Sequence, residues 1–300
     1  MMILSQSIFM LISIVIGLVA IFIVTGMWKK LEISRRYIRQ TKKAAFSDSL
    51  LRNPGQYLLD QISDGQIDIG MRLGSLMVLP PMFVMLYSYL PASKQNINTI
   101  ALMGIIFIFV FVWPLFIVRK LFIQLQLNRI GYDGELASAQ EFNQLMRHGY
   151  YVFHDMQAEK FNIDHVVIGP AGVFAIETKT RSKQNVKGVE AAKVFVNGSI
   201  LQYPTHQDKA SLDQALNQAK WLSAFLTKSV GKRIVAEPVL SLPGWLVERR
   251  TSETPVMVIN PKEAVKFIAN KKAVLDDQTV QQIKYQVEQK CRDVKPTRPM

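Results

Sequence analysis

The stretch Phe161–Thr180, which reads FNIDHVVIGPAGVFAIETKT, decides the fold of the region around it. Two apolar, β-branched runs flank the four residues at 169–172, GPAG, in which Pro is second and Gly is last. A turn of this composition between two such runs predicts a β-hairpin. Counting outward from the turn pairs Ile168 with Val173, and each further pair follows from the same count.

The predicted register places two acids opposite one another near the open end of the hairpin. Asp164 faces Glu177, and Lys179 points to the same face because side chains alternate along a strand. Directly opposed positions bring the Cβ atoms to roughly 4.5–5.5 Å, where like charges repel. Two acids so placed between apolar strands predict a divalent cation bound through oxygen, as Mg²⁺ is. Lys179 would then activate a water or stabilise a developing negative charge.

A second interpretation of the same three residues is a cross-strand charge cluster at the end of a sheet, without catalytic function. The apolar residues around the trio favour the active-site interpretation, because buried charges need partners. Spacing alone leaves both interpretations open.

Three motifs together resemble a known family. They are GYDGE at 131–135, NIDHVV at 162–167 and ETK at 177–179. The combination is similar to the nuclease-related domain, NERD, which is placed in the PD-(D/E)XK nuclease superfamily. The resemblance runs from about Gly131 to about Ile268. Ile163 stands where the superfamily frequently has Pro before its first Asp.

The resemblance implies both a fold and a set of site residues. The fold would be α/β, with a restriction-endonuclease-like mixed sheet flanked by helices. Asp164 and Glu177 would be ligands of Mg²⁺ or Mn²⁺, Lys179 the catalytic lysine, and Glu135 the helix acid that completes the metal site. Gln214 matches a polar position of a later helix in the family, which implies an auxiliary role at the substrate.

The composition indicates a membrane part joined to a soluble part. The chain has 300 residues, of which 49% are hydrophobic and 20% charged. The single cysteine, Cys291, excludes an internal disulfide and a cysteine-based zinc cluster.

Apolar runs and loop charges predict four segments. Residues 1–28 form a transmembrane helix, since Ile3–Trp28 is uncharged and exceeds the roughly 20 residues that span a bilayer. Residues 29–72 form a basic cytoplasmic connector, 73–120 a transmembrane helical hairpin, and 121–300 a cytoplasmic nuclease-like domain. The connector opens with seven basic residues, which by the positive-inside rule leave the N-terminus outside: Lys29, Lys30, Arg35, Arg36, Arg39, Lys42 and Lys43.

Within the predicted transmembrane helical hairpin, Pro80-Pro81 predicts a kinked or broken helix. The last run ends at Arg119-Lys120, which again indicates the cytoplasmic side. In the soluble part, Gly134 is expected to open a new helix that ends at about His148, with Glu135 in its first turn, where the helix dipole favours an acid.

Further elements are expected along the soluble part. Asn197-Gly198 predicts a second hairpin. The remaining elements are a strand at 150–154, a helix at 208–228, strands at 233–240 and 255–259, and helices at 261–269 and 276–291. This order fits one mixed sheet flanked by helices. His165 points away from Asp164 and is expected to be structural.

The charge of the soluble part is uneven. Residues 121–180 carry four Lys or Arg against seven Asp or Glu, whereas residues 181–300 carry twenty against eleven. An acidic centre beside a basic flank suits a phosphodiesterase acting on nucleic acid, whose backbone is bound by Lys and Arg. The basic excess could equally serve solubility or lie against an anionic leaflet.

We therefore expect a membrane-anchored, metal-dependent nuclease that hydrolyses phosphodiester bonds of DNA, or of RNA. The alternatives are a non-catalytic, membrane-tethered module of the same fold that binds nucleic acid, or one that docks a protein partner.

Overall fold

The computed structural model describes residues 49–91, 95–183, 192–251 and 254–294. The chain divides into two compact units, which are described separately. Among the described residues, the first unit contains Ile62–Gln126, and the second contains the residues up to Gln61 together with those from Leu127 onward. The first predicted span, residues 1–28, lies outside the described residues.

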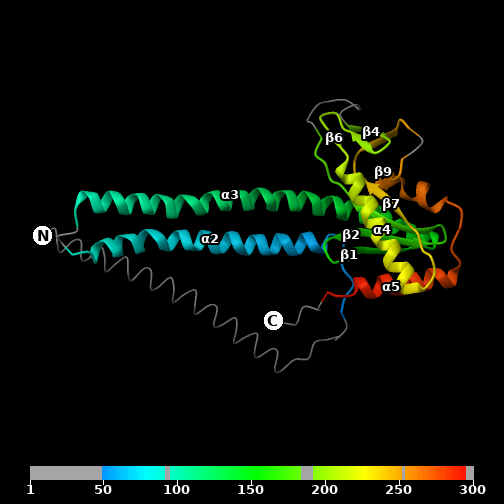
Figure 1. Ribbon diagram of the computed structural model, residues 1–300, viewed down its shortest axis with the longest axis horizontal. Coiled ribbons are helices and arrows are strands. Elements are labelled where there is room, and N and C mark those ends of the chain that lie inside the picture. The colour runs from blue at the N-terminus through cyan, green and yellow to red at the C-terminus, as the bar shows by residue number, and fades with distance from the viewer. Residues whose placement is uncertain (1–48, 92–94, 184–191, 252–253, 295–300) are drawn as a thin grey trace, which may run out of the picture. The chain divides into compact units, whose positions relative to one another are not determined.

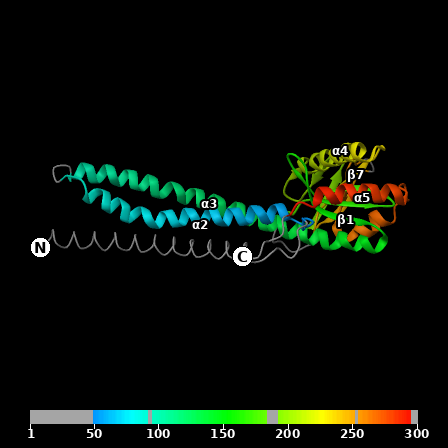
Figure 2. The ribbon, with the colours of Figure 1, turned by 90° about the horizontal axis from the view of Figure 1, so that it is seen from below.

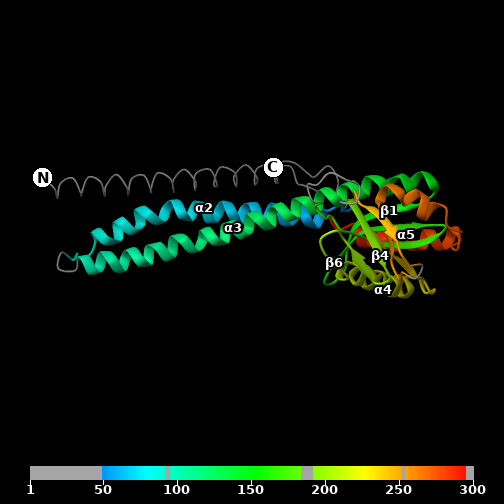
Figure 3. The same cartoon turned by 90° about the horizontal axis from the view of Figure 1, so that it is seen from above.

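The first unit is a pair of long helices. Helix α2 spans Gln56–Ser88 and helix α3 spans Ile97–Phe142, and they run side by side between 62 and 126 in all three views (Figures 1, 2 and 3). Ile69 of α2 packs against Val118 and Leu125 of α3. One helix of the described residues, Ile97–His148, is long and apolar enough to cross a membrane, and none of its apolar window is buried.

The helices differ from the prediction in their continuity. Helix α2 begins at Gln56, inside the predicted connector, and runs through Pro80-Pro81 without a break. The predicted break is therefore wrong, whereas the predicted kink stays a prediction, since an interior proline removes a backbone hydrogen bond and its ring crowds the preceding turn. Helix α3 likewise continues from the apolar run to Phe142, followed by a 3₁₀ segment, Asn143–His148. The predicted helix start at Gly134 is therefore wrong.

The second unit contains two sheets, where the sequence predicted one. The first sheet has the order β1-β2-β3-β7-β9 and the second the order β6-β5-β4-β8. The strands of the first sheet are β1 (Tyr151–Gln157), β2 (Asn162–Gly169), β3 (Gly172–Thr178), β7 (Ala236–Ser241) and β9 (Met257–Ile259). Those of the second are β4 (Lys193–Asn197), β5 (Ile200–Gln202), β6 (Gln207–Asp208) and β8 (Leu246–Arg249).

The central hairpin has the predicted register. Strands β2 and β3 are antiparallel and pair Ile168 with Val173 across the turn. Gly172 closes this turn with φ of 128°, a conformation that favours glycine. Strand β7 pairs with β3 in parallel, which makes the sheet mixed, as expected. The strand before the hairpin, β1, is three residues longer at its end than the predicted 150–154.

Helices cover both faces of the first sheet. Helix α4 (Ala210–Val230) and helix α5 (Asp277–Cys291) pack on one face, where their apolar side chains meet Ile163, Val166 and Ala175. Phe142 at the end of α3 packs on the opposite face, so Figure 3 shows this part of α3 and α4 on either side of the strands. Short helices at Pro261–Glu263 and Val265–Ala269 complete that face. Both sides of the hairpin are thus buried.

Candidate active site

The two acids of the hairpin lie where its strands stop pairing. The outermost pair of the β2–β3 ladder is His165 with Ile176, so Asp164 and Glu177 each lie one residue beyond this pair. The side chain of Asp164 accepts a hydrogen bond from the backbone N–H of Thr178, at 2.7 Å. Asp164 is 6% exposed and Glu177 is 3% exposed. The structure therefore brings both predicted acids together in a buried setting.

Lys179 and a glutamine hold the carboxylate of Glu177. The Nζ of Lys179 lies 2.5 Å from Oε1 of Glu177, and Nε2 of Gln218 donates to Oε2 at 2.5 Å. The side chain of Lys179 is partly exposed. Glu177 is thus oriented through both of its oxygens.

Gln218 is not among the residues predicted from the sequence; the predicted residue is Gln214, one turn earlier on α4. Gln214 is exposed, whereas Gln218 is buried. The signal was present in the helical period: Gln218 shares the buried side of α4 with Ala215 and Leu222. A polar residue on an apolar face needs a partner, and Glu177 is that partner.

The third acid, Glu135, reaches the site from the interior of α3. Its side chain is 7% exposed. The preceding Gly134 allows a close approach, because a Cβ there would lie 1.6 Å from Oγ1 of Thr180, in the segment that follows β3. Glu135 is therefore not placed by a helix dipole, as the sequence suggested, but by contact between α3 and the segment that carries Lys179.

Burial and mutual repulsion disfavour the charged forms of Glu135 and Asp164. Burial raises the pKa of Glu135 to about 8, with further contributions from the negative charges of Asp155 and Glu177, and Lys179 acts in the opposite sense. Burial also raises the pKa of Asp164 well above its ordinary value, and the charges of Glu177 and Glu135 add to the rise. The site therefore brings together acids whose charged forms are destabilised by burial and by one another.

The donor set fits a divalent cation in its chemistry. Oε2 of Glu135 is buried without a hydrogen-bond partner, and carboxylate oxygens are what Mg²⁺ prefers. No group of three or more His, Cys, Asp or Glu side chains in the described parts of the chain is arranged to hold a metal. Mg²⁺, however, is usually held by one or two carboxylates together with waters and substrate phosphates. Asp164 and Glu177 can supply the two carboxylates.

Comparison with protein families identifies this region. Residues 130–243 match the family described as nuclease-related domain. The chain carries a NERD domain. The match confirms the resemblance drawn from the three motifs, and it contains Glu135, Asp164, Glu177 and Lys179. Comparisons with curated proteins and with solved structures gave no significant match.

The histidine beside Asp164 belongs to the other face of the NERD sheet. His165 is fully buried next to the ring of Phe142, and its Nδ1 lies 2.9 Å from Nδ1 of His154. Its predicted structural role is consistent with this packing against the sheet.

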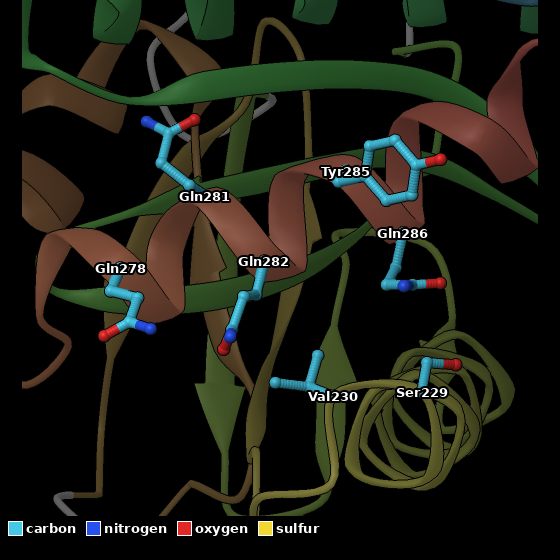
Figure 4. A pocket seen from close by; sticks show the side chains of 7 residues that line it. All are labelled: Ser229, Val230, Gln278, Gln281, Gln282, Tyr285 and Gln286. Carbon is cyan, nitrogen blue, oxygen red and sulfur yellow. The ribbon is translucent and has the colours of Figure 1, made fainter.

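A separate pocket of about 650 Å³ lies between the end of α4 and helix α5 (Figure 4). Gln282 and Gln286 point from α5 toward Val230 and Ser229 of α4. The described lining residues include no Asp, Glu, Lys or Arg.

The raised pKa of Glu135 has a consequence for stability. Because the folded pKa of about 8 lies above the ordinary glutamate pKa of 4.5, the folded state binds more protons than the unfolded state between these two pH values. Stability contributed by the protonated acid is present below pH 4.5 and is lost as pH rises through about 8. Each such group contributes at most ~1.4 kcal/mol per pH unit.

We expect Glu135→Gln to reduce the loss of folding stability as pH rises toward 8, because glutamine does not ionise. The variant should therefore be more stable than the parent at pH 8 in the presence of chelator. Melting of the full chain from pH 5 to 9 measures the effect. Glu141→Gln, a change on the same helix, is the control. Identical pH slopes for the parent and Glu135→Gln would contradict the assignment.

Proposed function

We propose that the NERD domain of this chain hydrolyses phosphodiester bonds of nucleic acid in a reaction that requires a divalent metal. The observation that carries the proposal is the buried pair of Asp164 and Glu177 with Lys179 at 2.5 Å from Glu177, inside a nuclease-related domain. DNA is the substrate that we propose, and RNA is the alternative that the assay below distinguishes.

The residues divide the chemical tasks among them. Asp164 and Glu177, with Glu135 beside them, would hold Mg²⁺ or Mn²⁺. The bound metal would polarise the phosphate and lower the pKa of a coordinated water. Lys179 would orient the attacking water and stabilise the negative charge that develops on the phosphate oxygens. Hydrolysis then adds the water oxygen to phosphorus, breaks a P–O bond and leaves the departing oxygen protonated.

A non-catalytic module of the same fold, which binds nucleic acid or docks a protein, is the competing proposal. Such a module has no use for several buried acids that repel one another, since each raises the free energy of the folded state. The acid–acid–lysine set therefore favours catalysis.

A cleavage assay with the full chain tests the proposal. The parent is incubated with labelled single- and double-stranded DNA and RNA, in Mg²⁺, in Mn²⁺ and in chelator. We expect cleavage in metal only. Asp164→Asn and Lys179→Ala should each lower the rate by at least about 100-fold, since both act on the charged transition state. Asp213→Asn, an exposed acid on α4, is the matched control.

Nucleic acid that remains uncut in every metal but binds equally to the parent and to Asp164→Asn would support the binding module instead. Failure to bind any nucleic acid at low salt would support the protein-docking alternative.

A row of cations next to the site is the proposed contact for the substrate backbone. Arg181 and Lys183 follow Lys179 at alternate positions and are exposed. Nη2 of Arg181 lies 2.8 Å from Oδ2 of Asp208, and the backbone oxygen of Arg181 accepts a hydrogen bond from Nε1 of Trp245. The ammonium of Lys183 lies 5.6 Å from the centre of the Trp245 ring. These contacts tie Arg181 and Lys183 to Asp208 and Trp245.

We expect Lys183→Ala to weaken nucleic-acid binding and to lower the slope of log affinity against log salt by about 0.7–0.9 for the lost phosphate contact. Fluorescence anisotropy in chelator, in the Asp164→Asn background, measures binding without cleavage. Lys284→Ala on α5 is the charge-matched control. An equal slope for all three proteins would exclude Lys183 from the interface.

We also propose that the chain is anchored in a lipid bilayer by three spans, with the N-terminus outside and the NERD domain in the cytoplasm. Support comes from the exposed apolar window of α3, from the uncharged run Ile3–Trp28 and from the basic residues that follow each run. The anchor would confine the nuclease to the membrane surface.

A further inference from the structure

The most unusual acid of the NERD-containing unit is Asp155 on β1, which the proposed chemistry does not use. It is fully buried, with 0% exposure, and its φ of 50° is the one positive value recorded for a non-glycine in the described residues. The β1–β2 ladder pairs His154 with His165 and Met156 with Ile163, so the register places Asp155 opposite Asp164. Strained backbone of this kind persists where the surroundings enforce it, often at functional sites.

Three groups compensate the buried charge of Asp155. Nη1 of Arg52 lies 2.6 Å from Oδ2, the backbone N–H of Tyr57 donates to the same oxygen at 2.9 Å, and Nδ2 of Asn162 donates to Oδ1 at 2.6 Å. Arg52 and Tyr57 come from the segment 49–61, which precedes most of α2 and belongs to the same compact unit.

The same segment is docked at the C-terminal end of α5. The guanidinium of Arg52 donates to both oxygens of Asp293, at 2.7 and 3.0 Å. Leu50 forms a β-bridge with Val294. The backbone N–H of Arg52 donates to the carbonyl of Cys291 at 3.0 Å. Arg52 is therefore fixed by two carboxylates and by its own backbone.

A chain of hydrogen bonds continues from Asp155 to the active site. Nε2 of Gln218 donates to the carbonyl of Asn162 at 3.0 Å and to Oε2 of Glu177 at 2.5 Å. Asn162 thus touches Asp155 with its side chain and Gln218 with its backbone. The order of contacts is Arg52, Asp155, Asn162, Gln218 and Glu177.

The segment also approaches the third acid. A Cβ at Gly55 would lie 2.7 Å from Cδ2 of Tyr132 and 3.5 Å from Oε2 of Glu135. The turn before α2 therefore packs against the part of α3 that carries Glu135.

We propose that segment 49–61, which lies outside the family match at 130–243, is a working part of the nuclease site, with Arg52, Asp155 and Gln218 as positioning residues for Glu177. The inference rests on the proposed nuclease function. A fragment that begins at Leu121 lacks Arg52. Asp155 would then remain buried without its cation, and an uncompensated buried charge strongly destabilises the folded state. The active unit must contain both segment 49–61 and the NERD domain.

A double-mutant cycle in the full chain tests the coupling. Arg52→Ala and Gln218→Ala should each lower kcat by about 10- to 100-fold, the range for residues that orient ligands from outside, with KM little changed. If both act through Glu177, the double variant should lose little more than either single variant. Arg52→Lys should restore part of the rate because it keeps the charge. Gln282→Ala and Lys271→Ala, which breaks the ion pair with Glu237, are the controls.

Losses that multiply in the double variant would overturn the inference, because they would show that the two residues act independently. If Arg52→Ala does not fold, Arg52→Lys replaces it in the cycle.

Hydrogen exchange gives a readout that needs no activity. Arg52→Ala should increase the exchange rate of the amides at Glu177–Lys179 relative to the centre of β7, and Lys271→Ala should not. Faster exchange at these amides in a protein that cleaves nothing would support the coupling and reject the nuclease. If the parent cleaves nucleic acid, the losses in kcat multiply in the double variant and the exchange of the Glu177–Lys179 amides is unchanged, the nuclease is supported and the coupling is rejected.

Discussion

The burial of like charges at the open end of the β2–β3 hairpin is the constraint on which the rest of the domain depends. Asp164 and Glu177 are almost completely buried, and Glu135 lies close enough for the charges to raise the pKa of both Asp164 and Glu135. Apolar cores do not retain such groups without partners. Lys179 and Gln218 satisfy Glu177, the Thr178 amide satisfies an oxygen of Asp164, and an oxygen of Glu135 is left without a partner.

The surrounding elements bring these groups together from distant parts of the chain. Helix α3 passes the site without a break, and the absence of a side chain at Gly134 lets the Lys179–Thr180 segment contact it. Helix α4 presents Gln218 from the opposite layer, and β1 contributes Asp155, which ties the site to Arg52. The acids are thus held in place by helices on both sides of the sheet.

Part of the fold and of the candidate site can be predicted from local sequence patterns. The Gly-Pro-Ala-Gly turn and the period of two determine the hairpin register, and with it the positions of Asp164, Glu177 and Lys179. Gly134 was interpreted as a helix start because a glycine gives the same signal whether it ends a helix or allows close packing. The burial of Gln218 follows from the helical period of α4, but its contact with Glu177, the second sheet and the role of Arg52 depend on residues far apart in sequence, which no local pattern specifies.

The central claim is that the hairpin acids form a divalent-metal site. Titration of the full chain with Mn²⁺, followed by electron paramagnetic resonance, tests this claim most directly and requires no substrate. We expect saturable Mn²⁺ binding that Mg²⁺ displaces, that Asp164→Asn abolishes and that Asp213→Asn leaves intact. Saturable binding of the same strength in Asp164→Asn, or the absence of saturable binding in the parent, would contradict the claim.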